Sequence, residues 1–88
     1  MRRAARADRN QAQIVAALRK VGATVLHLHS LGRGAPDILA GYRGRNILME
    51  IKTPKGKLTP QESDFMWGWK GQYAEVRTVD EALLAIKV

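Results

Sequence analysis

The sequence contains no cysteine and only two histidines. Without cysteine the protein can form neither a disulfide framework nor a thiolate zinc site, and two histidines are too few for a dedicated structural zinc site. Any bound metal is therefore expected to be a hard cation held by carboxylate oxygens.

Long apolar runs are also missing. No segment approaches the roughly 18 consecutive apolar residues that a membrane-spanning helix requires. The first ten residues, MRRAARADRN, are basic and lack the apolar core of a secretory signal. We therefore expect an intracellular protein. At 88 residues the chain has room for one hydrophobic core, so residues 1–88 are expected to form one domain. Domains of this size often gain buried surface by pairing, which makes a homodimer a reasonable expectation.

Acidic residues are scarce: eight Asp and Glu stand against fifteen Lys and Arg, and the formal net charge is +7. In so small a domain this charge indicates a polyanionic partner. An anionic membrane surface is the competing partner, but the basic residues are scattered and no helix combines a broad apolar face with a cationic reverse. Nucleic acid is therefore the expected partner.

Hydrophobic periodicity and capping signals predict seven elements. Helices are expected over 8–21, after Thr59 and after Thr78, each at a capping-box pattern: Asp8/Gln11, Thr59/Glu62 and Thr78/Glu81. Strands are expected over 23–29, 37–42, 46–52 and 73–77, the second and third joined as an antiparallel hairpin. The order α-β-β-β-α-β-α predicts an α/β fold with a mixed sheet flanked by helices. Residues 1–7 are expected to form a flexible basic arm.

Two carboxylates and one ammonium are expected to meet at one end of this hairpin. Asp37 begins the first strand, while Glu50 and Lys52 lie near the end of the second and project from the same face. Such a cluster is costly in a core but suits phosphodiester hydrolysis. Asp37 and Glu50 would ligate Mg²⁺, with the backbone carbonyl of Ile51 as a further ligand. Lys52 would stabilise developing negative charge or orient the attacking water.

Each half of this cluster also has an ordinary structural interpretation. A Glu-x-Lys pair on a strand is usually a solvated face with a weak ion pair, and Asp after Pro is a common turn residue. The functional interpretation is favoured because both halves occur together in a basic chain, with Gly34 and Pro36 shaping the approach to Asp37.

Three segments resemble the VRR-NUC family of the PD-(D/E)XK nuclease superfamily: GAPDILAG at 34–41, MEIKT at 49–53 and GKLTP at 56–60. The resemblance spans nearly the whole chain. It implies a restriction-endonuclease-like αβββαβ(α) core, Mg²⁺ or Mn²⁺ dependence, cleavage of branched or flapped DNA, and catalytic roles for Asp37, Glu50 and Lys52. The small stand-alone members of the family are encoded by phages, by other viruses or by bacteria. They resemble Holliday junction resolvases in acting as homodimers. Their origin implies that this protein is located in the cytoplasm of a bacterium or of a virus-infected host cell.

Two positions depart from the family pattern. Many members carry a metal-binding glutamate on the first helix, where this chain has Gln11. Gln11 could ligate the metal weakly, orient a water or only cap the helix. Members also tend to have glutamine where this chain has Glu62. A capping bond is the favoured role of Glu62, and an active-site contact is the alternative.

Basic residues around the predicted site are candidates for DNA contacts. Arg33, Lys55 and Lys57 lie in glycine-containing loops, which suits phosphate binding. His27 and His29 share a predicted strand face and could touch a phosphate, although histidines at such positions more often only line a sheet surface. The arm would bind DNA non-specifically or remain a solvated tail; its arginines are Arg2, Arg3, Arg6 and Arg9.

Large apolar side chains crowd the helix predicted after Thr59. Phe65, Met66, Trp67 and Trp69 are too close in sequence to face a single core. A stacking platform for an unpaired base is one interpretation. A dimer interface formed by Met66, Trp67 and Trp69 is favoured, because aromatic and Met side chains are enriched in interfaces.

These observations lead to one hypothesis and two alternatives. The leading hypothesis is a homodimeric, Mg²⁺- or Mn²⁺-dependent DNA endonuclease with a preference for branched DNA such as four-way (Holliday) junctions. The first alternative is a flap or nicking nuclease of other specificity. The second is a catalytically weak DNA-binding module that retains the nuclease fold, which Gln11 leaves open.

Overall fold

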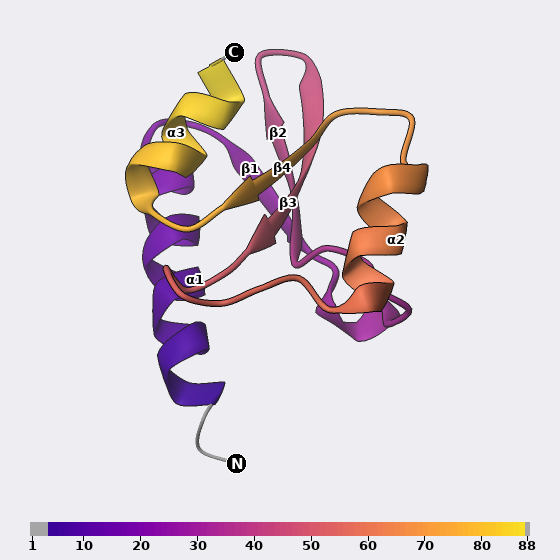
Figure 1. Cartoon of the computed structure of the whole chain (residues 1–88). Helices are drawn as coiled ribbons and strands as arrows, with labels where there is room; N and C mark the ends of the chain where they lie inside the picture. The colour runs from indigo at the N-terminus through magenta and orange to yellow at the C-terminus, as the bar shows by residue number, and fades with distance from the viewer. Residues whose placement is uncertain (1–3, 88) are drawn as a thin grey trace.

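The computed structural model describes the backbone of residues 4–87 and the side chains of residues 9–87. Its elements follow the predicted order, with one added 3₁₀ turn (Figure 1). They are α1 (Ala4–Lys20), β1 (Thr24–His27), η1 (His29–Leu31), β2 (Ile38–Tyr42), β3 (Arg45–Ile51), α2 (Pro60–Gly68), β4 (Tyr73–Val76) and α3 (Val79–Lys87). No helix in the described part of the chain is long and apolar enough to cross a membrane.

The four strands form one mixed sheet in the order β1-β2-β3-β4. β1 pairs antiparallel with β2, and β2 pairs antiparallel with β3 through a tight turn. Arg43 and Gly44 both have positive φ in that turn, 51° and 80°, as a two-residue hairpin turn requires. β4 pairs parallel to β3, because α2 carries the chain back to the end of the sheet at which β3 begins. The predicted α/β class and mixed sheet are confirmed.

Alternation along β3 separates the two faces of the sheet. Ile47, Met49 and Ile51 point into the hydrophobic core, where they meet Ile14 of α1 and Ile86 of α3. Figure 1 shows α1 and α3 packed side by side on this face and α2 on the other. The residues between them in β3, including Glu50, therefore face the α2 side.

The α2 side of the sheet is only partly covered. Cross-strand register aligns Leu26, Leu39, Leu48 and Tyr73 in one row across this face. Exposure falls along the row, from 58% at Leu26 to 7% at Leu48, because α2 covers one half of it. Phe65 reaches this face and lies 6.4 Å from Tyr73, measured between ring centroids.

The first helix begins earlier than predicted, at Ala4 rather than Asp8. The alanines at 4, 5 and 7 are strong helix formers, so the helix extends through most of the expected basic arm. The capping box predicted at Asp8 and Gln11 is therefore wrong, since both residues lie inside α1.

Two other local predictions differ in detail. β1 ends at His27 rather than His29, because the chain turns into η1. At α3, the backbone N–H of Glu81 donates to Thr78 Oγ1 at 3.1 Å, as a capping box requires. The Glu81 carboxylate, however, accepts from the backbone N–H of Arg77 rather than from Thr78. The capping box at Thr59 and Glu62 is complete, as predicted.

Candidate active site

Asp37 lies directly before β2 and opposite Glu50, because the register pairs Ile38 with Met49. The backbone N–H of Asp37 donates to the Met49 carbonyl at 3.1 Å. In return the backbone N–H of Ile51 donates to Asp37 Oδ2 at 2.7 Å. The Asp37 carboxylate is thus held at the end of β3 by the backbone of the same strand that carries Glu50.

Glu50 and Lys52 project from the same face, as predicted. Glu50 is only 2% exposed, and its Oε2 lies 3.4 Å from Lys52 Nζ. A third carboxylate joins them: Glu62 Oε1, from the first turn of α2, lies 2.7 Å from Lys52 Nζ. The active-site contact that was the alternative interpretation of Glu62 is therefore present together with its capping bond.

These side chains line one cavity of about 1070 Å³. α1 forms the opposite wall with Gln11, Ala12, Val15, Ala16 and Arg19. The lining is completed by His27, His29, Ile51, Thr53, Gly56 and Lys57. The cavity therefore joins the three predicted catalytic residues to basic and small side chains from separate parts of the sequence.

When all three are ionised, the carboxylates of Asp37, Glu50 and Glu62 carry more negative charge than Lys52 can balance. Burial, together with the negative charge of Asp37, raises the pKa of Glu50 to about 8. Burial also raises the pKa of Asp37, although its hydrogen bond from Ile51 acts in the other direction. Burial opposes ionisation of Glu62 as well, but the hydrogen bonds from Lys52 and from the Thr59 backbone N–H, together with the positive charge of Lys52, outweigh it and hold the pKa of Glu62 below its ordinary value. An added cation would relieve this imbalance.

The donor set fits a hard divalent cation. Glu50 Oε1 is buried and has no hydrogen-bond partner, which leaves one carboxylate oxygen free to bind a metal. No three His, Cys, Asp or Glu side chains are grouped as a metal site among the described residues. A cation here would accordingly be coordinated by the Asp37 and Glu50 carboxylates. Its remaining ligands would be the Ile51 carbonyl, the Gln11 amide or water.

Neither the protein-family models nor the curated proteins give a match to this sequence. A solved structure described as a VRR_NUC domain does match. It covers 92% of this chain and 94% of its own, with 24% sequence identity and a TM-score of 0.70. The chain has the fold of a VRR_NUC domain. The restriction-endonuclease-like core that the resemblance implied is thereby confirmed.

In this VRR_NUC fold the loop after β3 is tied to β4 and α1. The Arg77 guanidinium donates to the carbonyls of Thr53 and Gly56, at 2.8 and 2.5 Å, and forms an ion pair with Glu75. Asn10 Nδ2 donates to the Lys52 carbonyl at 2.9 Å. These two side chains, which the sequence did not single out, hold the backbone that follows Lys52. Their polar character alone gave no sign of this role, because the contacts span 21 to 42 residues.

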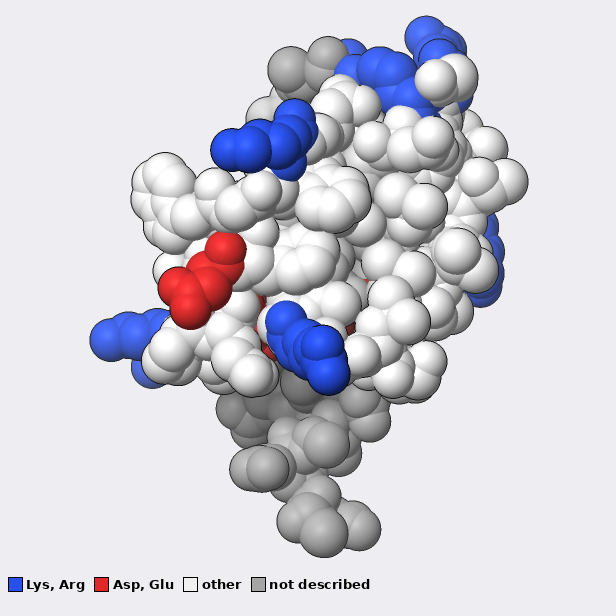
Figure 2. Space-filling model, turned by 90° about the vertical axis from the view of Figure 1, so that its right-hand side faces the viewer, with Lys and Arg blue, Asp and Glu red and all other residues white. Residues whose placement is uncertain are grey.

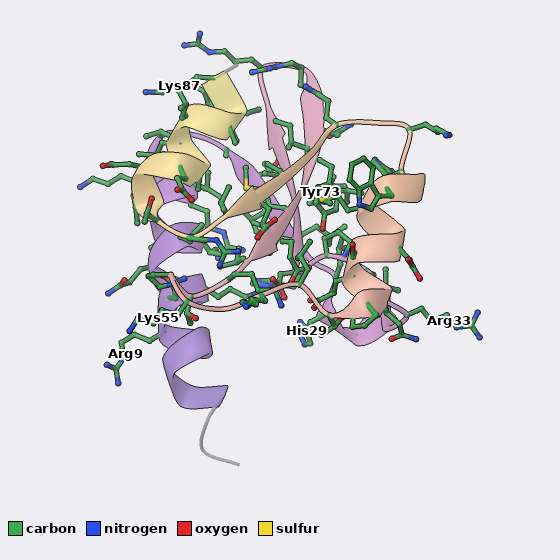
Figure 3. All side chains as sticks on the ribbon, in the orientation of Figure 1. Arg9, His29, Arg33, Lys55, Tyr73 and Lys87 are labelled. Atoms are coloured by element: carbon green, nitrogen blue, oxygen red, sulfur yellow. The ribbon has the colours of Figure 1, made fainter. Side chains whose placement is uncertain are left out.

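The residues predicted to contact DNA are not all near the cavity. Lys57 lines it, whereas Lys55 and Arg33 are exposed outside its lining. Figure 3 shows Arg33 pointing away from the molecule beyond α2 and Lys55 on the opposite side. Arg19, which is not among the residues predicted to contact DNA, lines the cavity from α1.

The two histidines meet at the cavity although only His27 belongs to β1. Their rings pack edge to face with centroids 6.3 Å apart. Gln11 Nε2 lies 3.5 Å from His27 Nδ1, so the Gln11 side chain reaches toward the cavity from the middle of α1. Of the interpretations of Gln11, helix capping is excluded by this position, and the metal-ligand and water-orienting roles stay predictions.

The remaining predicted arginines lie near the N-terminus. Arg9 is an exposed residue of α1 (Figure 3). Arg6 belongs to the same helix, but its side chain is outside the described part of the structure, and Arg2 and Arg3 lie outside the described residues. Their DNA-binding role stays a prediction.

The two tryptophans near the end of α2 are exposed. Trp67 is 78% exposed and Trp69 45%, while Met66 is half-buried. Trp69 follows the end of α2 and stacks on Phe65 with ring centroids 5.5 Å apart. Figure 2, which looks onto this side of the molecule, shows a broad uncharged area interrupted by a few basic side chains and one acidic patch.

Proposed function

We propose that this protein is a DNA endonuclease that hydrolyses phosphodiester bonds with Mg²⁺ or Mn²⁺. The observation that carries the proposal is the meeting of Asp37, Glu50 and Lys52 at one cavity, with a buried oxygen of Glu50 lacking a partner. The VRR_NUC fold supports it, because the name of the matched domain denotes a nuclease.

Each residue has a distinct part in the proposed reaction. Asp37 and Glu50 would hold the metal, with the Ile51 carbonyl as a further ligand and Gln11 as another candidate. A metal bound there would supply an acidified water and polarise the phosphate. Lys52 places its ammonium beside the reacting phosphate and stabilises the charge that develops on it, as a fixed cation does best where water is excluded. Arg77 and Asn10 keep the backbone after Lys52 in place.

DNA is the proposed partner, and its backbone would follow the basic parts of the cavity wall. Lys57 and Arg19 line the cavity on different elements, and the chain as a whole carries a charge of +7. Lys55 and Arg33 would extend contacts beyond the cavity, and His27 with His29 would contact phosphate inside it.

We further propose a homodimer that prefers branched DNA, in particular four-way junctions. The exposed side chains of Trp67 and Trp69 support pairing through the α2 side, since a second copy would remove them from water. Two sites in one dimer would allow paired cuts on opposite strands of a junction.

Cleavage assays test both parts of this proposal. End-labelled four-way junction, flap, single-stranded and linear duplex DNA are incubated with Mg²⁺, Mn²⁺ or chelator. The variants are Asp37→Ala and, as a matched control, Asp80→Ala, which removes an exposed aspartate of α3. Metal-dependent cutting that Asp37→Ala abolishes and Asp80→Ala retains is the expected result.

The outcomes separate the alternatives. Symmetric paired nicks on the junction would support resolution by a dimer, whereas preferential cutting of the flap would favour another branched specificity. Tight binding without cleavage in either metal would refute the nuclease and favour a DNA-binding module. Light scattering of the wild type and Trp67→Ser/Trp69→Ser tests the dimer, which the double substitution should convert to monomer.

A further inference from the structure

Glu62 connects the first turn of α2 to Lys52. Its Oε1 accepts a hydrogen bond from the backbone N–H of Thr59 at 2.9 Å and lies 2.7 Å from Lys52 Nζ. The nearest oxygen of Glu50 is farther from the same ammonium, at 3.4 Å. The capping box that begins α2 therefore also holds the end of the Lys52 side chain.

The same turn is fixed against the loop that leads to Asp37. Gly34 approaches α2 so closely that a Cβ on it would lie 2.6 Å from the Gln61 carbonyl carbon and 3.0 Å from the Glu62 nitrogen. This contact is independent of the ion pair, because it joins backbone to backbone. The position of the Glu62 carboxylate is consequently defined from two sides, by Thr59 within α2 and by the loop at Gly34.

We propose that Glu62 is a positioning residue for Lys52, a role that rests on the proposed nuclease function. A lysine ammonium on a flexible stem moves toward the nearest carboxylate that lacks a partner. Without Glu62 that carboxylate is Glu50, and the ammonium would then compete with the metal for its oxygens. Glu62 keeps the ammonium at the cavity wall, so the first turn of α2 sets its distance from Asp37 and Glu50.

Three variants separate positioning from helix capping. Glu62→Ala removes both contacts of the carboxylate, whereas Glu62→Gln keeps an oxygen that can accept from Thr59 and Lys52. Glu81→Ala is the matched control. Glu81 occupies the corresponding position of α3, where its backbone N–H donates to Thr78 and its carboxylate accepts from the Arg77 backbone. No ion pair of Glu81 occurs among the described residues.

The first measurement follows the Lys52 ammonium itself and needs neither metal nor DNA. In ¹⁵N-labelled protein, the Nζ resonance of Lys52 is assigned by its loss in Lys52→Arg. The chemical shift of this resonance should be nearly the same in the wild type, Glu62→Gln and Glu81→Ala, and should move in Glu62→Ala, because the ammonium then lies against Glu50. An Nζ chemical shift that stays at the wild-type value in Glu62→Ala would overturn the proposal.

The second measurement is cleavage, with kcat and KM determined separately. A displaced catalytic group costs mainly kcat, so Glu62→Ala should lower kcat by about tenfold or more and leave KM for DNA almost unchanged. Glu62→Gln should retain most of the activity, and Glu81→Ala should match the wild type. If the wild type cuts and Glu62→Ala keeps its kcat, the positioning role alone is refuted. If the wild type cuts nothing in either metal, the proposed nuclease function itself is refuted.

Discussion

Asp37 Oδ2 accepts a 2.7 Å hydrogen bond from the backbone N–H of Ile51, across the antiparallel pair of β2 and β3. Asp37→Asn keeps an acceptor for this N–H, whereas Asp37→Ala leaves it without one. An unsatisfied buried donor costs about 1–3 kcal/mol, so Asp37→Ala should be less stable than Asp37→Asn by about this amount in urea unfolding. Neither variant should cleave DNA. Equal stability of the two variants would show that the bond contributes nothing to the fold.

Glu50 makes the stability of the metal-free protein depend on pH. Its pKa in the folded protein is about 8, raised from an ordinary value of 4.5 by burial and by the charge of Asp37. The folded state therefore binds the proton more tightly than the unfolded state. This stabilisation is complete below pH 4.5 and is lost as the pH rises through about 8.

Glu50→Gln removes this titration while nearly preserving the shape of the side chain. In chelator, the melting temperature of the wild type should fall relative to that of Glu50→Gln as the pH rises from 5 to about 9. Mg²⁺ should reduce the difference, because a cation stabilises the ionised carboxylate. Parallel melting curves for the two proteins across this range would contradict the raised pKa.

Gly34 and Gly32 form a matched pair for the contact with α2. Both have positive φ, 79° and 70°, but a Cβ on Gly32 would meet nothing within 4 Å. Gly32→Ala should therefore cost only backbone strain, about 1–3 kcal/mol. Gly34→Ala should cost more, because its Cβ must also displace the Gln61 backbone. Chemical denaturation of both variants measures the difference, and equal losses would mean that the close approach is easily relieved.

Substitutions of Lys57 and Lys87 test whether the DNA backbone contacts the basic side chains that line the cavity. Lys57 lines the cavity, whereas Lys87 lies at the end of α3 (Figure 3). In chelator, Lys57→Ala should weaken junction binding and reduce the magnitude of the negative slope of log K against log salt by about one. Lys87→Ala should change the slope little. Equal effects of both substitutions would indicate diffuse attraction by net charge rather than a contact at the cavity.

Local sequence signals predicted most of the elements. Glu50 and Lys52 must share a strand face, because side chains alternate with a period of two, and the short turn at Arg43 and Gly44 makes the hairpin antiparallel. The capping box of Thr59 and Glu62 likewise lies within four residues, so its two hydrogen bonds could be predicted from the residue types. The boundary error at Asp8 came from the same kind of signal, since a strong capping pattern also occurs inside a helix that alanines extend.

What the sequence by itself determined is the set of groups that short-range geometry brings together: the order of the strands and helices, the shared face of Glu50 and Lys52, and the start of α2. Only the tertiary structure decided that Glu62 reaches Lys52, that Arg77 and Asn10 hold the backbone after Lys52, and that the fold of one chain leaves Trp67 exposed. The physical reason is distance along the chain. Contacts between residues far apart in sequence depend on how whole elements pack, and neither periodicity nor capping carries that information.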